Sequence, residues 1–182
     1  LYFVRSKSQE DFEKQKYDVI INATGNDNTG MLIEDYLIRT CTLNKTTPII
    51  HTWIEPLGIG GHSLLVNNVQ GGGCLNCLYV PTETGLYNKA SFVAKNQSIS
   101  KSLSGCVGNF TPYSSMDAQR TSIQTVELVL STLLENTEGN PIISWRGSKD
   151  RLEKQGYLVS ERYLNITDAE LFEKRYEYKN PN

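Results

Sequence analysis

Apolar, β-branched residues gather near the middle of the chain, and this stretch predicts the core of the fold. Residues 49–54 read IIHTWI, an apolar run typical of a buried strand. Proline and glycines between residues 56 and 61 interrupt the run, and residues 62–69 resume it. Three glycines then lead into a C-x-x-C element. Residues 48–79 therefore predict a strand, a turn, a second strand and a glycine-rich approach to two cysteines.

A shorter apolar run lies upstream of this stretch. Residues 18–21 (DVII) predict a buried strand, and residues 22–30 (NATGNDNTG) predict a loop, because their residue types tolerate turn geometry. The pattern from residue 31 to residue 39 predicts a helix with Thr29 as its cap. A strand that ends in such a loop and leads into a helix is the arrangement in which α/β proteins bind ligands.

The downstream half contains one strong helix signal. Residues 81–104 are polar and weakly patterned, so we expect a flexible crossover loop there. Ser114, with Asp117 three residues later, resembles a capping box. Apolar residues follow at helical spacing, namely Ile123, Val126, Val129, Leu130, Leu133 and Leu134. Residues 142–145 and 157–163 predict two more strands.

These elements predict an α/β fold. The 182 residues suffice for one domain with a real core. A glycine-rich phosphate-binding loop after an initial strand is missing from the pattern, together with the helix that should follow it. We therefore expect residues 1–182 to be the C-terminal portion of a larger α/β domain.

Composition narrows the possible partners. A formal net charge of −2 provides no general attraction to nucleic acid or to a membrane surface. No run approaches the roughly 20 apolar residues that a spanning helix needs. Four cysteines are too few for a disulfide scaffold of this size. We expect a reduced, cytoplasmic protein without nucleic-acid or membrane partners.

Cys74 and Cys77 have the spacing of a zinc knuckle, in which two thiolates grip one edge of a tetrahedral ion. Cys41 and Cys106 are the other thiols, and neither belongs to a second pair. A redox dithiol and two thiols packed as small hydrophobic groups are the alternatives. The spacing favours half of a zinc site over either alternative.

Cys106 lies between glycines, upstream of the capped helix. A thiol close to a helix N-terminus has a lowered pKa and becomes a better nucleophile. The alternative is a small residue that fills a tight turn, and the local pattern alone slightly favours this alternative.

Two histidines and two carboxylates are further candidates. The apolar strand around His51 predicts a hydrogen-bonded core histidine, whereas His62 follows two glycines and could face a ligand. Glu55 and Asp27 are the carboxylates nearest to predicted strand ends. Each is more often a solvated loop acid than a catalytic group.

Several motifs together resemble the ThiF/MoeB superfamily, the adenylating enzymes related to ubiquitin-activating enzymes. They are PII at residues 48–50, CLNCLY at 74–79, DVIINATGN at 18–26, and the SGC of residues 104–106 before the late helix. The similarity covers roughly residues 17–136. The forms IEPLGIGGH and WRG are most similar to the bacterial ubiquitin-transfer-like proteins of CBASS anti-phage operons. In those proteins an activating domain follows a conjugating-enzyme-like domain.

The resemblance implies a Rossmann-like adenylation domain with a mixed sheet flanked by helices. It implies ATP and Mg²⁺ as cofactors, adenylation of the C-terminus of a partner protein, and transfer of the acyl group to a cysteine. Cys106 is the implied thioester-forming cysteine, and Cys74 and Cys77 are the implied first half of a structural zinc site. The nucleotide-binding loop maps onto Thr24, Gly25, Asn26 and Asp27.

The resemblance also implies partners. They are a protein C-terminus, with the nucleotidyltransferase of a CBASS operon as the candidate, a conjugating-enzyme-like domain, and a second copy of the chain in a homodimer.

The chain departs from the family at one motif. Where the family has D-x-T-D-N, Asn22 and Gly25 stand in place of the two aspartates, so the resemblance leaves Asp27 as the candidate substitute ligand. This departure keeps open a non-catalytic dimerisation or partner-binding module with the same fold. A third alternative is a sulfur-carrier-activating adenylyltransferase that works through a cysteine persulfide.

Overall fold

The chain folds around a five-stranded mixed sheet with strand order β1-β2-β3-β8-β9. The computed structural model describes residues 17–39, 47–67, 73–83, 85–97, 99–102, 109–135, 137–165 and 174–177. The strands of the sheet are β1 (Ile20–Asn22), β2 (Ile49–Ile54), β3 (Gly60–Val66), β8 (Pro141–Arg146) and β9 (Lys174–Glu177). β1 and β2 run parallel, and the other neighbouring pairs are antiparallel.

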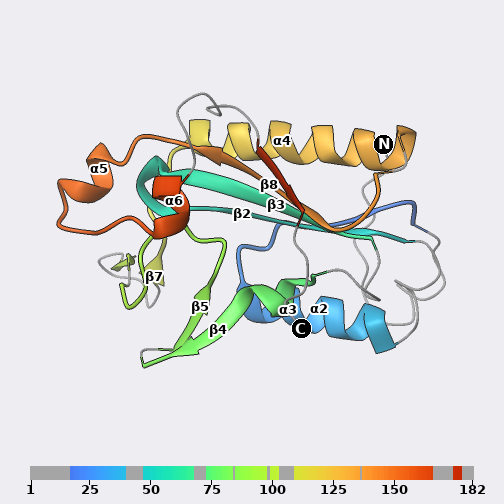
Figure 1. Cartoon of the computed structure of the whole chain (residues 1–182), viewed down its shortest axis with the longest axis horizontal. Helices are drawn as coiled ribbons and strands as arrows, with labels where there is room; N and C mark the ends of the chain where they lie inside the picture. The colour runs from blue at the N-terminus through green and yellow to red at the C-terminus, as the bar shows by residue number, and fades with distance from the viewer. Residues whose placement is uncertain are drawn as a thin grey trace.

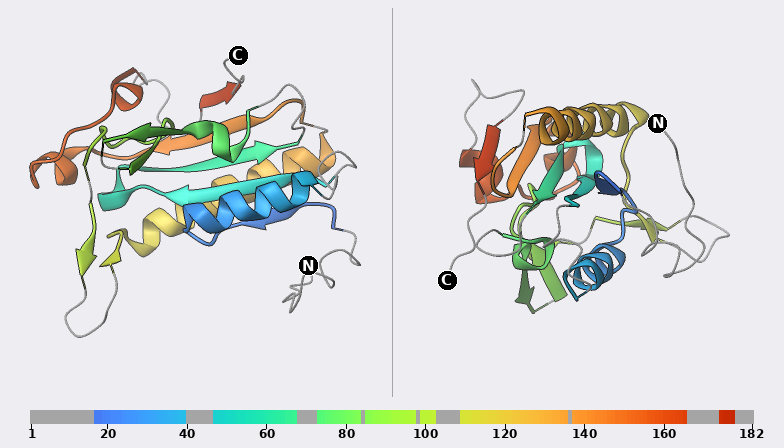
Figure 2. Two further views of the ribbon diagram at one scale, coloured as in Figure 1. Left: turned by 90° about the horizontal axis from the view of Figure 1, so that it is seen from below. Right: turned by 90° about the vertical axis from the view of Figure 1, so that its right-hand side faces the viewer.

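Helices cover both faces of this sheet (Figure 1). α4 (Ser115–Leu134) lies on one face, and α2 (Asp27–Arg39) and α3 (Leu75–Leu78) lie on the other (Figure 2). The predicted α/β fold with a mixed, helix-flanked sheet is therefore confirmed. No helix in the described ranges is both long and apolar enough to cross a bilayer.

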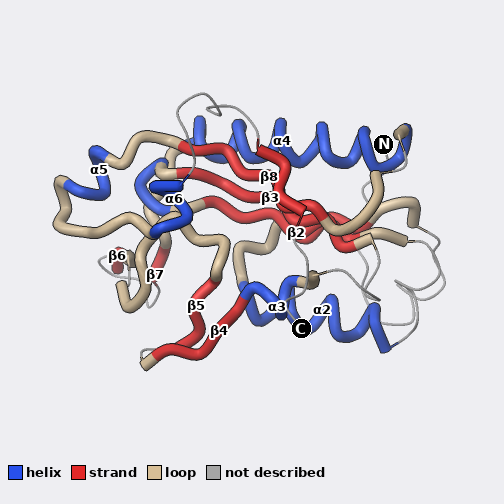
Figure 3. The backbone as a smooth tube through the Cα atoms, in the orientation of Figure 1, coloured by secondary structure: helices blue, strands red, loops and turns tan. Residues whose placement is uncertain are grey.

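Smaller elements complete the described chain (Figure 3). Near one end of the sheet lie η2 (Pro56–Gly58), α5 (Asp150–Glu153) and α6 (Glu161–Asn165). Two small antiparallel pairs stand apart from the sheet, β4 (Tyr79–Thr82) with β5 (Gly85–Asn88), and β6 (Lys101–Ser102) with β7 (Asn109–Phe110).

Strand β2 divides its side chains between the two helical layers, because successive residues of a strand point to opposite faces. Ile49 packs in the cluster that contains Leu75 of α3, and Ile50 packs with Leu128 of α4. His51 consequently lies on the α2 side of the sheet and Thr52 on the α4 side.

Most of the predicted elements are present. The strands predicted at residues 49–54, 62–69 and 142–145 correspond to β2, β3 and β8, with β3 beginning at Gly60. The capping box of α4 is complete, because Ser114 Oγ accepts from the Asp117 amide at 3.2 Å and Asp117 Oδ2 accepts from the Ser114 amide at 2.8 Å. The strand predicted at residues 157–163 is wrong, since only Val159 makes a β-bridge there and α6 begins at Glu161.

The upstream predictions need two corrections. Helix α2 begins at Asp27, and its cap is Asn26 rather than Thr29, because Asn26 Oδ1 accepts from the Thr29 amide at 2.9 Å. The predicted strand lies at Ile20–Asn22, and Ile21 is 48% exposed. β1 pairs only with β2 in the described sheet, so an edge position replaces the expected buried one.

Residues 81–104 are more regular than their composition predicts. The described part contains the end of β4, all of β5 and β6, and a bridge from Val93 to Val159. Phe92 is fully buried in a cluster with Ile59 and Leu152. The adjacent side chains of Phe92 and Val93 thus anchor this polar segment to the core. The expected crossover role and flexibility of this segment stay a prediction.

Helix α4 contacts the sheet mainly through polar side chains. Its buried residues are Asp117, Thr121, Gln124, Thr125 and Leu128. Trp145 Nε1 donates to Thr121 Oγ1 at 2.9 Å. Gln124 Nε2 lies 3.1 Å from both Ser63 Oγ and the Ile143 carbonyl oxygen. Hydrogen bonds across this layer therefore replace much of the usual apolar helix–sheet contact, and most of the predicted apolar positions of α4 face outward.

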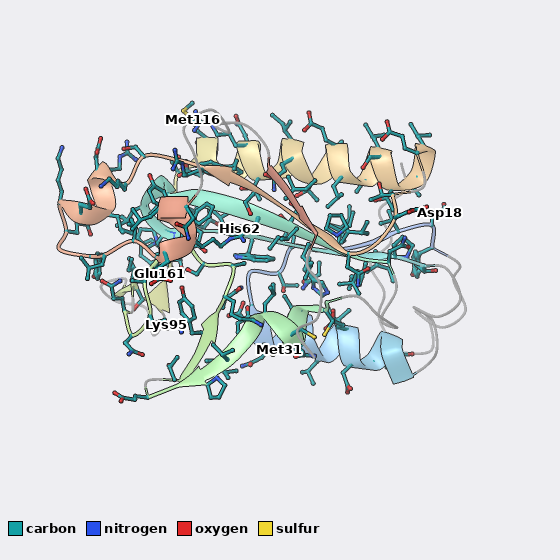
Figure 4. All side chains as sticks on the ribbon, in the orientation of Figure 1. Asp18, Met31, His62, Lys95, Met116 and Glu161 are labelled. Carbon is teal, nitrogen blue, oxygen red and sulfur yellow. The ribbon has the colours of Figure 1, made fainter. Side chains whose placement is uncertain are left out.

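A second buried polar group lies within the sheet. His62, labelled in Figure 4, is fully buried, and its Nδ1 lies 2.7 Å from Ser144 Oγ. Its Nε2 lies 3.1 Å from Glu55 Oε1, and Glu55 also accepts from the Phe92 amide at 3.3 Å. His62 therefore does not face a ligand, and Glu55 is not a solvated acid. Burial lowers the pKa of His62, against the opposing effect of its hydrogen bond with Glu55.

This burial predicts a pH-dependent stability. Because the pKa of His62 in the folded protein lies below its ordinary value of 6.5, the unfolded chain binds a proton first as the pH falls. The free energy of unfolding should decrease below about pH 6.5, by up to about 1.4 kcal/mol per pH unit.

The measurement is urea denaturation between pH 7.5 and pH 5. His62→Gln keeps an amide for Glu55 and Ser144 but has no titrating ring, so its pH dependence should be shallower by up to one proton. Parallel profiles for the two proteins would contradict the assignment.

Candidate functional site

A small pocket lies beside the carboxyl end of β1, on the α2 side of the sheet. The space between its walls, with the solvent at its mouth included, is about 260 Å³. Its lining residues come from the loop after β1, from β2, from α3 and from β4, and they are Asn22, Thr24, Gly25, Asn26, Asp27, His51, Thr52, Trp53, Leu75 and Tyr79. All four residues that the motif resemblance assigns to a nucleotide-binding loop therefore line one pocket.

The Asn22 side chain holds the loop. Its Oδ1 accepts from the Thr24 hydroxyl at 2.9 Å and from the Thr24 amide at 3.3 Å. Gly25 follows with φ of 64°, in the left-handed region that favours glycine. Since Oδ1 accepts these bonds, the amide nitrogen of Asn22 points the other way and donates to His51 Nδ1 at 3.0 Å.

His51 connects this loop to a buried carboxylate. Because Nδ1 accepts from Asn22, the proton of the neutral ring lies on Nε2, which faces Glu34 Oε1 at 3.5 Å. His51 is 1% exposed and Glu34 is 0% exposed. The predicted core histidine is therefore confirmed, and it has a position directly behind the pocket.

Glu34 also holds the first turn of α3. Its Oε1 accepts from the Leu75 amide at 2.9 Å, and its Oε2 accepts from the Asn76 amide at 3.3 Å. Gly30 permits the close approach of α2, since a Cβ at this position would lie 2.7 Å from Asn22 Nδ2 and 2.8 Å from Leu75 Cδ2. One carboxylate thus fixes α3 against α2 and faces the histidine behind the pocket.

Sequence reasoning missed Glu34 and Tyr79. An available signal for Glu34 was its spacing, four residues after a helical glycine and three after Met31, on the apolar side of α2. Tyr79 had no comparable signal, because its place in the pocket depends on the fold.

Asp27 is the one carboxylate among the lining residues of this pocket. Burial, and next a hydrogen bond with Asp27, raise the pKa of Tyr79 far above its ordinary value, so the phenol stays neutral. Mg²⁺ is commonly bound by one or two carboxylates together with substrate phosphates. Asp27 fits that requirement, whereas Asn22 does not, because its side chain is already committed to Thr24 and His51.

Cys74 immediately precedes α3 and Cys77 lies within it, with their Sγ atoms 2.8 Å apart. Burial raises the pKa of Cys74 to about 12, and the contact with Cys77 and the charge of Glu34 add to the shift. Within the described ranges, no cluster of three or more histidine, cysteine, aspartate or glutamate side chains could hold a metal. A tetrahedral zinc with Zn–S bonds of about 2.3 Å holds two sulfurs about 3.8 Å apart, so these two thiols would have to separate to share an ion.

Cys41 and the predicted nucleophile Cys106 lie outside the described residues. The zinc site and the thioester role therefore both stay predictions.

Comparison with known proteins gives one similar protein. The chain is 28% identical over 150 residues to the ATP-dependent ubiquitin transferase-like protein Cap2 of Escherichia coli (strain TW11681). The match covers 81% of this chain and 23% of that protein, so the chain spans about a quarter of its relative's length. No family model matches the chain, and no solved structure matches it significantly. The chain is thus similar, at low identity, to one stretch of a protein whose name describes ATP-dependent ubiquitin-like transfer.

The direction of the hydrogen bond from Asn22 to His51 gives a test of the site. Asn22→Asp introduces the acid of the motif that this loop resembles, but a carboxylate cannot donate to His51 Nδ1. The ring must then either move its proton to Nδ1 and turn the bare Nε2 toward Glu34, or take up a second proton between two buried carboxylates. We expect a loss of about 1–3 kcal/mol in the free energy of unfolding at pH 7, measured by urea denaturation.

Asn26→Asp is the matched control. Its carboxylate still accepts from the Thr29 amide, so the helix cap survives and the stability should change by less than about 0.5 kcal/mol. Equal effects of the two changes would contradict the role of Asn22.

Proposed function

We propose that the chain is part of a ubiquitin-activating-like enzyme, which adenylates the C-terminus of a partner protein and then forms a thioester. One observation carries the proposal. The loop of Thr24 to Asp27 lines a pocket with a single carboxylate, in a chain similar to an ATP-dependent ubiquitin transferase-like protein. Because the chain spans about a quarter of that relative, the activity is proposed for the natural full-length protein.

The first step is adenylation. A carboxylate oxygen of the partner's C-terminus attacks the α-phosphorus of ATP, and pyrophosphate leaves. Asp27 on the pocket wall would hold Mg²⁺, which would supply positive charge to balance the charge that develops on the phosphates. The neutral phenol of Tyr79 adds no competing negative charge beside Asp27. The hydrogen bond from the Thr24 hydroxyl to Asn22 fixes the turn before Gly25. Space beside Gly25 is free, because a Cβ added there would have no atom within 4 Å.

The second step is thioester formation on Cys106. Its thiolate attacks the acyl carbon of the adenylate, AMP leaves, and the acyl group stays on sulfur. This assignment rests on the resemblance of residues 104–106 and the following helix to the adenylating family.

The proposed setting is conjugation in bacterial anti-phage defence. A CBASS nucleotidyltransferase would supply the C-terminus, a conjugating-enzyme-like domain would receive the thioester, and the activating domain would form a homodimer. These partners follow from the motif resemblance.

A non-catalytic partner-binding module is the second candidate. The observation in its favour is that Asn22 and Gly25 occupy the positions of the two family aspartates, and both ends of the Asn22 amide are engaged. Release of pyrophosphate by the natural protein separates the two functions. A sulfur-carrier activator would instead leave persulfide sulfur in the covalent adduct, which mass spectrometry detects.

Two variants separate the two steps. In the natural full-length protein with ATP, Mg²⁺ and the partner protein, Cys106→Ala should abolish a thiol-sensitive adduct and leave pyrophosphate release largely intact. Asp27→Ala should slow pyrophosphate release by about tenfold or more, because it removes the metal-binding carboxylate of the pocket.

Glu83→Ala, an exposed acid on the β4–β5 turn, is the matched control and should change neither step. An adduct that survives Cys106→Ala, or unchanged pyrophosphate release by Asp27→Ala, would count against the corresponding assignment.

The thiol pair gives a separate test. If Cys74 and Cys77 are half of a zinc site, the purified natural protein should contain about one zinc per chain, lost in Cys74→Ser and in Cys77→Ser. Elemental analysis by mass spectrometry measures the metal. Full zinc content in both variants, or its absence from the natural protein, would refute the site.

A further inference from the structure

Tyr79 joins the pocket to the small hairpin of β4 and β5. Its ring packs against the apolar cluster that contains Leu75 and Leu78. Tyr79 also lines the pocket, and its hydroxyl forms a hydrogen bond with Asp27. β4 follows α3 directly along the chain, so the hairpin begins beside the pocket (Figure 1). A hairpin residue therefore contacts the one carboxylate among the residues that line this pocket.

Asn88 determines the direction of the hydrogen bond between Tyr79 and Asp27. In the register of the hairpin, Asn88 lies directly opposite Tyr79. Asn88 Oδ1 accepts from the Ala90 amide at 2.9 Å, so its NH₂ group faces the other way and donates to Tyr79 Oη at 3.4 Å. The phenolic oxygen thus accepts one hydrogen bond, and its own proton is available for Asp27. An ionised carboxylate can only accept, which agrees with this direction.

The base of the hairpin is fixed to the core. Ala90 is buried in the same apolar cluster as Leu78. The Lys89 amide donates to the Leu78 carbonyl oxygen at 2.8 Å. The tip, by contrast, is exposed at Leu86. Asn88 and Tyr79 lie at the fixed end, so the hydroxyl that meets Asp27 has a defined position.

A fixed donor matters at Asp27 because this residue is exposed. It is the first residue of α2, and an exposed aspartate side chain can occupy several rotamers. Mg²⁺ requires near-ideal octahedral geometry, so a carboxylate that binds it must be held in one orientation. Carboxylates that bind metals are accordingly hydrogen-bonded by neighbouring groups. A carboxylate has two oxygens, and a bond from Tyr79 to one leaves the other for a metal.

We infer that Tyr79 is a positioning residue for Asp27. Its hydrogen bond, aligned by Asn88, holds one oxygen of the carboxylate and leaves the second for the Mg²⁺ of a bound nucleotide. This inference rests on the proposed function, because that function assigns the metal to Asp27. It makes the base of the β4–β5 hairpin a part of the nucleotide site, although the hairpin stands apart from the main sheet.

A purely structural role is the alternative. A partly buried phenol needs a hydrogen-bond partner of its own, and Asp27 provides one. In that case, loss of the hydroxyl would lower the stability of the protein but would not change its affinity for a metal. The two roles therefore differ in what Tyr79→Phe does to metal-dependent binding.

The experiment measures how much Mg²⁺ tightens the binding of a non-hydrolysable ATP analogue to the natural full-length protein. Calorimetry gives the dissociation constant in EDTA and in Mg²⁺, and the ratio of the two constants reports the contribution of the metal. Tyr79→Phe should reduce this ratio by about tenfold and leave the constant in EDTA unchanged. Asn88→Asp still accepts from the Ala90 amide but cannot donate to Tyr79, so it should reduce the ratio by about threefold.

Tyr87→Phe controls for the loss of a hydroxyl. It removes a phenolic group from the other strand of the same hairpin, where Tyr87 Oη donates to the Val93 carbonyl oxygen at 3.0 Å, and it should leave the ratio unchanged. An equal reduction by Tyr87→Phe would assign the effect to the stability of the hairpin and overturn the inference.

Asp27→Ala separates this inference from the proposed function. If Asp27→Ala leaves the ratio unchanged, the metal assignment of the proposed function fails, and the role of Tyr79 fails with it. If Asp27→Ala reduces the ratio but Tyr79→Phe does not, the metal assignment survives and the role of Tyr79 alone is overturned.

Discussion

The buried carboxylate of Glu34 is the constraint on which the site depends. It is inaccessible to solvent, accepts two backbone N–H groups at the start of α3 and faces His51. A buried charge is costly unless hydrogen bonds surround it, so these partners must be in place together. His51 in turn accepts from Asn22, whose other end fixes the pocket loop. The pocket wall and the turn that carries Cys74 therefore share one anchor.

The sheet separates two faces of different character. On the α2 side, Glu34, His51 and Asn22 hold the pocket loop in place. The space beside Gly25 in that loop is free, which suits binding of a polar ligand. On the α4 side, polar groups lie against the sheet and apolar groups point outward. The sheet thus separates a candidate nucleotide pocket from a helix whose apolar side chains are exposed.

Local signals in the sequence predicted much of the fold. The β-branched run of β2 and the capping box at Ser114 both act within a few residues, so their elements lie where the pattern placed them. Periodicity predicted the apolar stripe of α4 but not its outward orientation, because the groups that hold the polar side, Ser63 and Trp145, are distant in sequence. The helix at Glu161 likewise depends on packing of Tyr163 in a distant cluster.

Only the part of the candidate site that is contiguous in sequence was predictable. The loop residues are consecutive, so a motif could identify them together, whereas Glu34 and Tyr79 reach the site only through the fold. The resembled motif has an aspartate at the position of Asn22, whereas here the side chain donates a hydrogen bond to His51. The sequence alone did not reveal this partner, which a carboxylate could not serve.

We propose above all that the pocket beside β1 binds the nucleotide of an adenylating enzyme. Photolabelling of the natural full-length protein with a photoreactive ATP analogue, followed by peptide mapping, tests it most directly. The account predicts label within the peptide that carries Thr24 to Asp27 or the peptide that carries Tyr79, with competition by unlabelled ATP. Competable label found only outside both peptides, or no competable label at all, would contradict it.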